Sequence, residues 1–183
     1  MEAVALVDAA GTDDAELEAL TARLAAATAE VESAPSLREG GLFSAEGFAS
    51  RLAERSPISG ESNPLAPPFR LWLDGDVTRA EACYGPAYEG PPGLLHGGVV
   101  AGAFDEILSV AQFASGLAGY TGTLTVRMRR PTPLLRTIEY EAGVDRVDGR
   151  KIHAWARSTC EGELLGEAEG IFVSSAERPP PDA

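Results

Sequence analysis

The residues of this chain best suited to chemistry lie in one short stretch near its middle. His96 is followed by two glycines, and an apolar run over residues 99–108 then carries Asp105 and Glu106. Glycines let a ligand approach backbone N–H groups closely. The run has helical length and is apolar on nearly every side, which is typical of a buried helix. Because a carboxylate in a buried helix is costly unless it is paired or used, this stretch is the first candidate for a functional site.

The chemistry that this stretch predicts is acyl hydrolysis. If a helix begins near Gly98, Asp105 lies about 10 Å further along its axis. The residues on the same face one and two turns earlier are small, namely Gly98, Ala101 and Gly102. At the start of the helix, the N–H groups of Gly97 and Gly98 suit an oxyanion or a polarised carbonyl oxygen. A carboxylate that reaches a water can act as the general base. Hydrolysis needs this base together with N–H donors near the carbonyl oxygen.

Each polar side chain of this stretch also has a structural interpretation. Asp105 could be paired with an arginine or could cap a loop, and from the helix alone that interpretation is the simpler one. Glu106 points about 100° away from Asp105 around the helix. We therefore expect Glu106 to be a structural or interface acid, and it is the alternative catalyst if the register differs. His96, beside two glycines, is expected to shape the loop rather than to act as the base.

The elements around this stretch divide into a helical N-terminal third and a strand-rich remainder. Residues 12–33 have acids at their start and apolar residues at helical spacing, which predict a helix that docks on the body or on a partner subunit. A second short helix is expected from about Ala45 to Arg55, with Ser44 as its cap. Residues 56–68 are rich in turn formers and predict a linker, which could also lie across the body as an ordered lip.

The remainder alternates apolar and polar residues in the manner of half-buried strands. The expected strands are 69–74, 78–84, 123–130, a segment around 138–144, 152–159 and 164–173, with loops at 85–93 and 116–122. The segments Asp74-Gly75-Asp76 and Asp148-Gly149 indicate turns. Pro131 and Pro133 should end a strand or place it at an edge. Two strands, a long helix and four antiparallel strands joined by short turns predict an α+β fold with the sheet wrapped around the helix.

Composition excludes several classes of partner. The chain has 183 residues and a formal charge of −13, so nucleic acid and anionic membranes are poor partners. No basic leader and no segment of transmembrane length are present, so a cytoplasmic protein without membrane insertion is expected. Cys83 and Cys160 lack metal-ligand spacing and should be reduced, with a disulfide as the alternative. With only His96 and His153 to add imidazole ligands, no metal site is expected.

Several segments together resemble the PaaI-like hotdog-fold thioesterases of the thioesterase superfamily. These are GPPGLLHGG, the acid nine residues after the histidine, RRPTPL and DRVDGRK. The resemblance implies a hotdog fold over residues 69–175, in which an antiparallel sheet wraps a long central helix. Residues 1–68 then form an extra helical segment with a proline-rich linker, and residues 176–183 form a disordered tail. The resemblance also implies hydrolysis of acyl-CoA without a further cofactor, by a homodimer or dimer of dimers with active sites at the subunit interface.

By the same resemblance, individual residues acquire roles. Asp105 is the general base or nucleophile, and the Gly97 amide holds the thioester carbonyl, with the Gly98 amide beside it. His96 orients the loop. Thr121, ten positions before the proline of the arginine-proline segment, helps to hold the attacking water. A Ser-His-Asp triad is not indicated, because no serine lies in a nucleophile-elbow sequence.

Two features concern ligand binding. Gly90 stands where some relatives carry Asn or Gln, so a non-catalytic acyl-CoA-binding protein on the same fold is the alternative function. No histidine and aspartate have the spacing of a hotdog dehydratase. A run of arginines without an intervening acid suits the phosphates of CoA, although a solvated strand face with scattered ion pairs is the structural interpretation. These arginines are Arg127, Arg129, Arg130 and Arg136.

Overall fold

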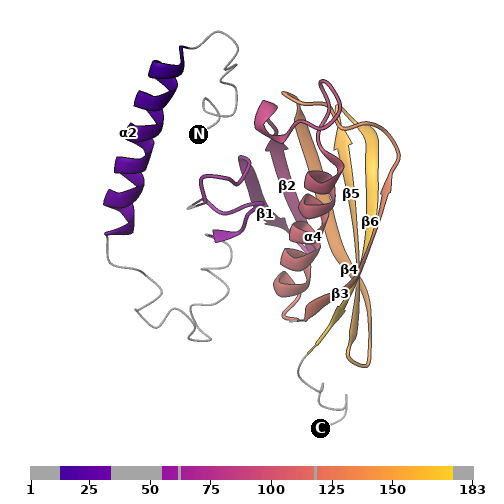
Figure 1. Ribbon diagram of the computed structural model, residues 1–183. Coiled ribbons are helices and arrows are strands. Elements are labelled where there is room, and N and C mark those ends of the chain that lie inside the picture. The colour runs from indigo at the N-terminus through magenta and orange to yellow at the C-terminus, as the bar shows by residue number, and fades with distance from the viewer. Residues whose placement is uncertain (1–12, 34–54, 62, 118, 175–183) are drawn as a thin grey trace.

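The computed structural model describes residues 13–33, 55–61, 63–117 and 119–174. The elements in chain order are α2 (Asp14–Glu32), β1 (Phe69–Asp74), β2 (Val77–Cys83), the 3-10 helix η2 (Pro86–Tyr88), α4 (Gly97–Ala114), β3 (Tyr120–Met128), β4 (Thr137–Asp148), β5 (Lys151–Cys160) and β6 (Glu163–Val173). Figure 1 shows α4 lying along one face of the sheet. This arrangement confirms the predicted α+β hotdog fold.

The six strands form one antiparallel sheet in the order β1-β2-β4-β5-β6-β3. Tight turns join β1 to β2, β4 to β5 and β5 to β6, as the sequence predicted. The prediction that short turns link all of the last four strands is wrong for β3. Residues 129–136 carry the chain from the β3 edge to the middle of the sheet, where β4 pairs with β2. Pro131 and Pro133 lie in this crossing, and β3 is the edge strand that they predicted.

Strand β3 begins earlier than the sequence predicted. The segment 116–122 was expected to be a loop, but Tyr120 pairs with Val173 and Thr121 pairs with Phe172. The register shifts between Thr121 and Thr123, around Gly122. A glycine inside a strand often marks such a bulge, and its lack of a side chain hides the strand pattern. Thr121 therefore belongs to the sheet, which holds its backbone in place.

Helix α4 is buried on one side only. Its sheet-facing side chains form the centre of the core, namely Val100, Ala103, Phe104, Ile107, Leu108 and Ala111. The other side of the helix carries Asp105 and Glu106, both half-buried. The sequence predicted a helix wrapped on all sides, whereas in one chain the sheet covers only the apolar side. None of the described helices combines the length and the apolar character needed to cross a membrane.

The predicted linker crosses α4 as an ordered segment, and residues 55–61 are called the strap from here on. Ile58 packs against the core cluster. The hydroxyl of Ser56 is an acceptor for the N–H groups of Ile58 and Ser59, at 3.1 and 3.3 Å. Further on, the Tyr88 hydroxyl donates to the Leu65 carbonyl at 3.0 Å. The sequence left open whether this segment is a plain linker or an ordered lip across the body, and the structure shows the ordered lip.

Helix α2 confirms the helix expected at residues 12–33. Leu20 and Leu24 are exposed on it, at 37% and 47% of their surface, and Figure 1 draws the helix apart from the sheet. The described side chains of α2 therefore show no docking of this helix on the body. Its docking on a partner subunit stays a prediction. Of the second predicted helix, Ala45 to Arg55, all but Arg55 lies outside the described residues.

Two tyrosines in the core hold each other through their hydroxyl groups. Tyr84 and Tyr140 are buried, and their hydroxyl oxygens are 2.8 Å apart. Burial raises the pKa of both phenols above the usual value of a tyrosine, so both stay neutral and one donates to the other. The ring of Phe104 meets Tyr140 edge-on, with centroids 5.9 Å apart. This pair therefore ties β4 and the segment after β2 to helix α4.

A double-mutant cycle tests the pair. Tyr140→Phe should lower the free energy of unfolding by about 1–3 kcal/mol, because it leaves a buried hydroxyl without its partner. Tyr84→Phe should do the same, and the double variant should lose less than the sum of the two, as judged by urea unfolding. Tyr120→Phe, on a side chain 74% exposed, is the control and should change stability by less than about 0.5 kcal/mol. Fully additive losses would contradict the pair.

Candidate active site

The turn before α4 is held by its own histidine. His96 is the N-cap of the helix, and its Nδ1 accepts the N–H of Gly98 at 3.0 Å. Its carbonyl oxygen accepts the N–H groups of Val99 and Val100 at 2.9 and 3.1 Å. Because Nδ1 is an acceptor here, the neutral ring carries its proton on Nε2. The structure thus places His96 where it shapes the loop, as the sequence analysis expected.

The two glycines after the histidine differ in the availability of their N–H groups. The Gly98 N–H is taken by the His96 ring, so the expectation that both amides are open donors is wrong for Gly98. Gly97 is the first residue of the helix, and within the described part of the chain its N–H has no hydrogen-bond acceptor. An open N–H at a helix N-terminus favours partial negative charge. Gly97 is therefore the candidate oxyanion donor.

Gly90 supports this turn through its lack of a side chain. A Cβ at this position would lie 2.8 Å from the Cα of His96, which is too close for any residue but glycine unless the backbone shifts. The Gly90 N–H donates to the Leu94 carbonyl, and the His96 N–H donates to the Tyr88 carbonyl, both at 2.9 Å. The Asn or Gln that the resemblance leads one to look for does not fit on this backbone.

Asp105 and Thr121, which the resemblance assigned to one site, meet in the structure. The Thr121 hydroxyl donates to Asp105 Oδ1 at 3.0 Å, across from helix α4 to the bulged start of β3. Among the described residues no lysine or arginine pairs with Asp105. The closed ion pair of the structural interpretation is thus not formed. A half-buried carboxylate that keeps an open side can accept a proton from a water.

Glu106 has a structural position. Its carboxylate accepts a hydrogen bond from the Ser59 hydroxyl of the strap, whereas Asp105 turns toward β3. The two acids therefore make their hydrogen bonds on different sides of α4. This agrees with the rotation of about 100° between consecutive helical residues. Glu106 thus has the structural role expected for it, and its alternative role as the catalyst stays a prediction.

Gly97 and Asp105 are well separated within one chain. Asp105 follows Gly97 by eight residues, which amounts to about 12 Å of rise and about 80° of rotation. A carbonyl oxygen that accepts from the Gly97 N–H lies about 3 Å from that nitrogen. It therefore lies near the first turn of the helix, while the carboxylate belongs to the third. This separation argues against the groove of the sequence analysis, in which both groups of one chain act together.

Each of the four clustered arginines is paired with an acid. The pairs are Arg127–Glu169 at 2.6 Å, Arg129–Glu167 at 2.7 Å, Arg130–Glu163 at 3.0 Å and Arg136–Glu161. The acids come from β6 and the turn before it, which lie beside the arginines only after folding. Hydrogen bonding and the nearby charge raise the pKa of Arg127 and Arg136. The cluster is thus an ion-paired strand face, as in the alternative interpretation, and its contact with CoA stays a prediction.

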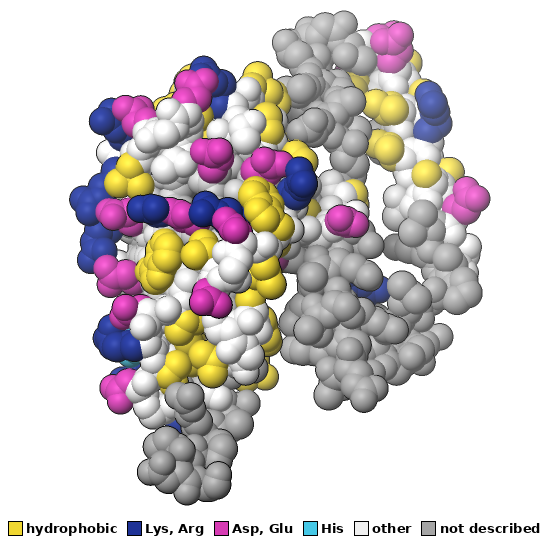
Figure 2. Space-filling view, turned by 180° about the vertical axis from the view of Figure 1, so that it is seen from behind, with side chains coloured by type: hydrophobic (Ala, Val, Ile, Leu, Met, Phe, Trp, Pro, Cys, Tyr) yellow, Lys and Arg dark blue, Asp and Glu magenta, His cyan; other side chains and the backbone are white. Residues whose placement is uncertain are grey.

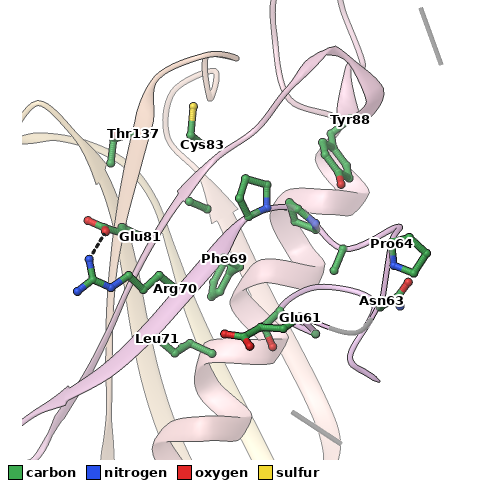
Figure 3. A pocket seen from close by; sticks show the side chains of 16 residues that line it. Glu61, Asn63, Pro64, Phe69, Arg70, Leu71, Glu81, Cys83, Tyr88 and Thr137 are labelled. Atoms are coloured by element: carbon green, nitrogen blue, oxygen red, sulfur yellow. Dashed lines mark hydrogen bonds and ion pairs between the residues drawn. The ribbon is translucent and has the colours of Figure 1, made fainter. Parts of the chain in front are cut away.

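The described residues also hold a groove at the β1–β2 end of the sheet. It has a volume of about 1050 Å³ and opens between strand β2 and residues 59–61 and 63–71. Phe69, Tyr88 and the Arg70–Glu81 ion pair are in its lining, as Figure 3 shows. None of the candidate catalytic residues lines it. In the described chain, no three His, Cys, Asp or Glu side chains are placed to hold a metal ion. Cys83 and Cys160 are free, so the alternative of a disulfide is wrong.

Comparisons with known proteins find relatives in sequence and in fold. A solved structure described as a thioesterase superfamily protein is 34% identical, with 88% of this chain and 86% of that chain aligned and a TM-score of 0.77. Acyl-coenzyme A thioesterase THEM4 from Bos taurus is 36% identical over 109 residues, 57% of this chain. The match spans 45% of that relative's own length. The E. coli PaaI protein, at 15% identity over 57% of this chain and 82% of that chain, has a TM-score of 0.54 and shows the fold alone. No family model matches the sequence.

Substitution of the histidine separates capping from proton transfer. His96→Ala should lower the free energy of unfolding by about 0.5–2 kcal/mol, because the Gly98 N–H loses its acceptor. His96→Asn should restore most of this stability, since the Asn oxygen is an effective N-cap acceptor. Thermal and urea unfolding of the three proteins measure the effect. Equal losses for both variants would contradict the capping role.

Proposed function

Because this chain belongs to the thioesterase superfamily and has the hotdog fold of PaaI, we propose that it hydrolyses acyl-CoA thioesters to a free acid and CoA. The observation that carries the proposal is the Asp105 carboxylate, which Thr121 holds at the open flank of α4. The similarity to a curated acyl-CoA thioesterase supports CoA as the thiol part of the substrate.

In the proposed reaction, Asp105 accepts a proton from a water, and the water oxygen attacks the thioester carbonyl carbon. The carbonyl oxygen becomes an oxyanion and accepts the Gly97 N–H at a helix N-terminus, where negative charge is favoured. The C–S bond then breaks, and the CoA thiolate takes up the proton. The hydrogen bond from Thr121 fixes the orientation of the Asp105 carboxylate, while one carboxylate oxygen accepts the proton of the water. These steps use only side chains, backbone and water, so they require no metal ion or cofactor.

A second copy of the chain completes the site in this proposal. Strand β3 is an edge of the sheet, and such an edge presents unpaired backbone groups to another chain. The Asp105–Thr121 pair lies at the start of β3. Gly97 lies beside Met128 at its end, because a Cβ at Gly97 would be 3.4 Å from the Met128 methyl carbon. Antiparallel pairing of two β3 strands would place the Gly97 turn of one copy near Asp105 of the other.

Arg127 in β3 and Arg129 just after it lie near the same edge and are the candidates for binding the phosphates of CoA. Arg127 and Arg129 are about half exposed, with 47% and 52% of their side-chain surface accessible. Exposed ion pairs of this kind contribute little to stability, because water screens the charges. A CoA phosphate can therefore replace a carboxylate partner at little energetic cost.

Turnover of a panel of acyl-CoA thioesters tests the proposal by thiol release. Asp105→Asn should lower kcat by about 10²–10⁴-fold, because the general base is lost while the shape is kept. Thr121→Val should lower kcat less, since it removes only the orienting hydrogen bond. The matched control is Thr123→Val, on an exposed side chain two residues further along β3, which should leave kcat unchanged. Saturable binding by the wild type without thiol release would instead favour the acyl-CoA-binding protein.

A further inference from the structure

One residue near the end of helix α4 holds both ends of the short connection to strand β3, which begins at Ser115 (Figure 1). The Leu117 N–H donates to the backbone carbonyl of Gln112 at 3.0 Å, and Gly116 has a φ of 72°. This is the Schellman ending of a helix. The side chain of Gln112 reaches further, because its Nε2 donates to the Gly119 carbonyl at 2.9 Å. Gln112 therefore ties the start of β3 to the helix.

Gln112 is an unusual residue for a protein core. Only 1% of its surface is exposed, and its Oε1 has no hydrogen-bond donor among the described residues. A buried polar atom without a partner lowers stability, and an apolar side chain of the same length would avoid this loss. Residues that break such a rule are expected at functional sites. The bond that Nε2 makes is thus a better account of Gln112 than its packing.

The start of β3, which this bond holds, is where the direction of the side chains changes. Leu124 and Val126 pack against the core, on the helix side of the sheet. Strict alternation would then put Gly122 on the helix side and Thr121 on the outer face. The bulge after Thr121 adds one residue and re-aims this side chain. Its hydroxyl therefore points to α4 and donates to Asp105.

Gly119 is a fixed point just before this bulge. A Cβ at Gly119 would lie 3.0 Å from the carbonyl carbon of Val173, so its backbone lies close against the end of β6. Because β3 is an edge strand, β6 is its one neighbour in the described sheet. A slip of one residue there would turn Thr121 to the outer face. Gln112 adds a second hold from the helix, seven residues after Asp105 and on the same helical face.

From this geometry we propose that Gln112 is a positioning residue of the active site. Its hydrogen bond to the Gly119 carbonyl keeps the bulge of β3 in the register that places the Thr121 hydroxyl on Asp105. The inference rests on the proposed thioesterase function and adds to it a residue that is buried in the core. Loss of this bond leaves the general base in place but lets Thr121 move away from it. The reaction then continues at a lower rate.

The test is thiol release from butyryl-, octanoyl- or myristoyl-CoA, whichever the wild type hydrolyses fastest. Gln112→Met keeps the length of the side chain but removes its amide. It should lower kcat by about tenfold with KM unchanged, because a small displacement at the reacting groups slows the reaction strongly. The midpoint of thermal unfolding should change by less than about 4 °C, since removal of the unpaired oxygen offsets the lost hydrogen bond.

The matched control is Ser115→Ala at the same end of α4. It removes the hydrogen bond from the Ser115 hydroxyl to the Ala111 carbonyl, at 3.0 Å, which does not reach β3. This variant should leave kcat unchanged. A loss of kcat as large as that of Gln112→Met would contradict the inference, because any disturbance of the helix end would then have the same effect.

A double-mutant cycle with Thr121→Val shows whether Gln112 acts through Thr121. Gln112→Met should lower kcat no more than Thr121→Val does. The double variant should have the same kcat as Thr121→Val alone, because the hydroxyl that Gln112 positions is already gone. A general disturbance of the core would instead multiply the two losses.

The outcomes separate the two proposals. An active wild type whose kcat is unchanged in Gln112→Met, or losses that multiply in the double variant, would overturn the role of Gln112 and leave the thioesterase function standing. A wild type that releases no CoA from any of the three substrates would overturn the function and the inference with it. If Gln112→Met does not fold, Gln112→Asn serves in the same cycle, because its amide is one methylene too short to reach Gly119 and the same loss is expected.

Discussion

The seating of helix α4 on the sheet is the constraint on which the rest of this structure depends. Phe104, Ile107 and Leu108 are fully buried between the helix and the strands. Burial of each such side chain contributes about 1.5–3 kcal/mol, whereas one hydrogen bond contributes about 0.5–1.5 kcal/mol net. Packing therefore sets the rotation of the helix, and the Thr121–Asp105 hydrogen bond follows from it. A shift of one residue would turn the carboxylate about 100° away from β3.

Small residues then decide what can approach this helix. At Gly90 the turn closes on the backbone of His96 through a contact that a Cβ would prevent, and at Gly102 the terminal methyl of Ile58 rests against the helix. The outer face of the sheet, which Figure 2 shows from behind, instead carries rows of arginine and acid with apolar patches between them. Pairs such as Arg79 with Glu141 belong to these rows. On the helix side, small residues thus allow neighbouring segments to pack closely. On the outer face, arginines lie beside acids.

Local patterns were sufficient to predict most of the fold and several members of the site. The sequence pattern predicted four strands to within one residue of their ends, and the position of Asp105 after the glycine turn identified the acid that meets Thr121. Most of what failed depended on contacts distant in sequence. The acids opposite the arginines come from β6 and the turn before it. The His96 ring takes the Gly98 N–H through a local geometry that spacing alone does not reveal. The strap contact joins residues 58 and 102, and a glycine inside an apolar helix was its only signal.

Subunit complementation tests the central claim most directly, namely that Asp105 of one copy and the Gly97 amide of another act on one thioester. Gly97→Pro removes the N–H, while proline suits the first helical position and the extended backbone of His96 before it. Two differently tagged chains, one Gly97→Pro and one Asp105→Asn, would be co-expressed and the mixed dimer purified through both tags. The account predicts that each variant alone is inactive and that the mixed dimer regains thioesterase activity. A purified mixed dimer as inactive as its parents would contradict it.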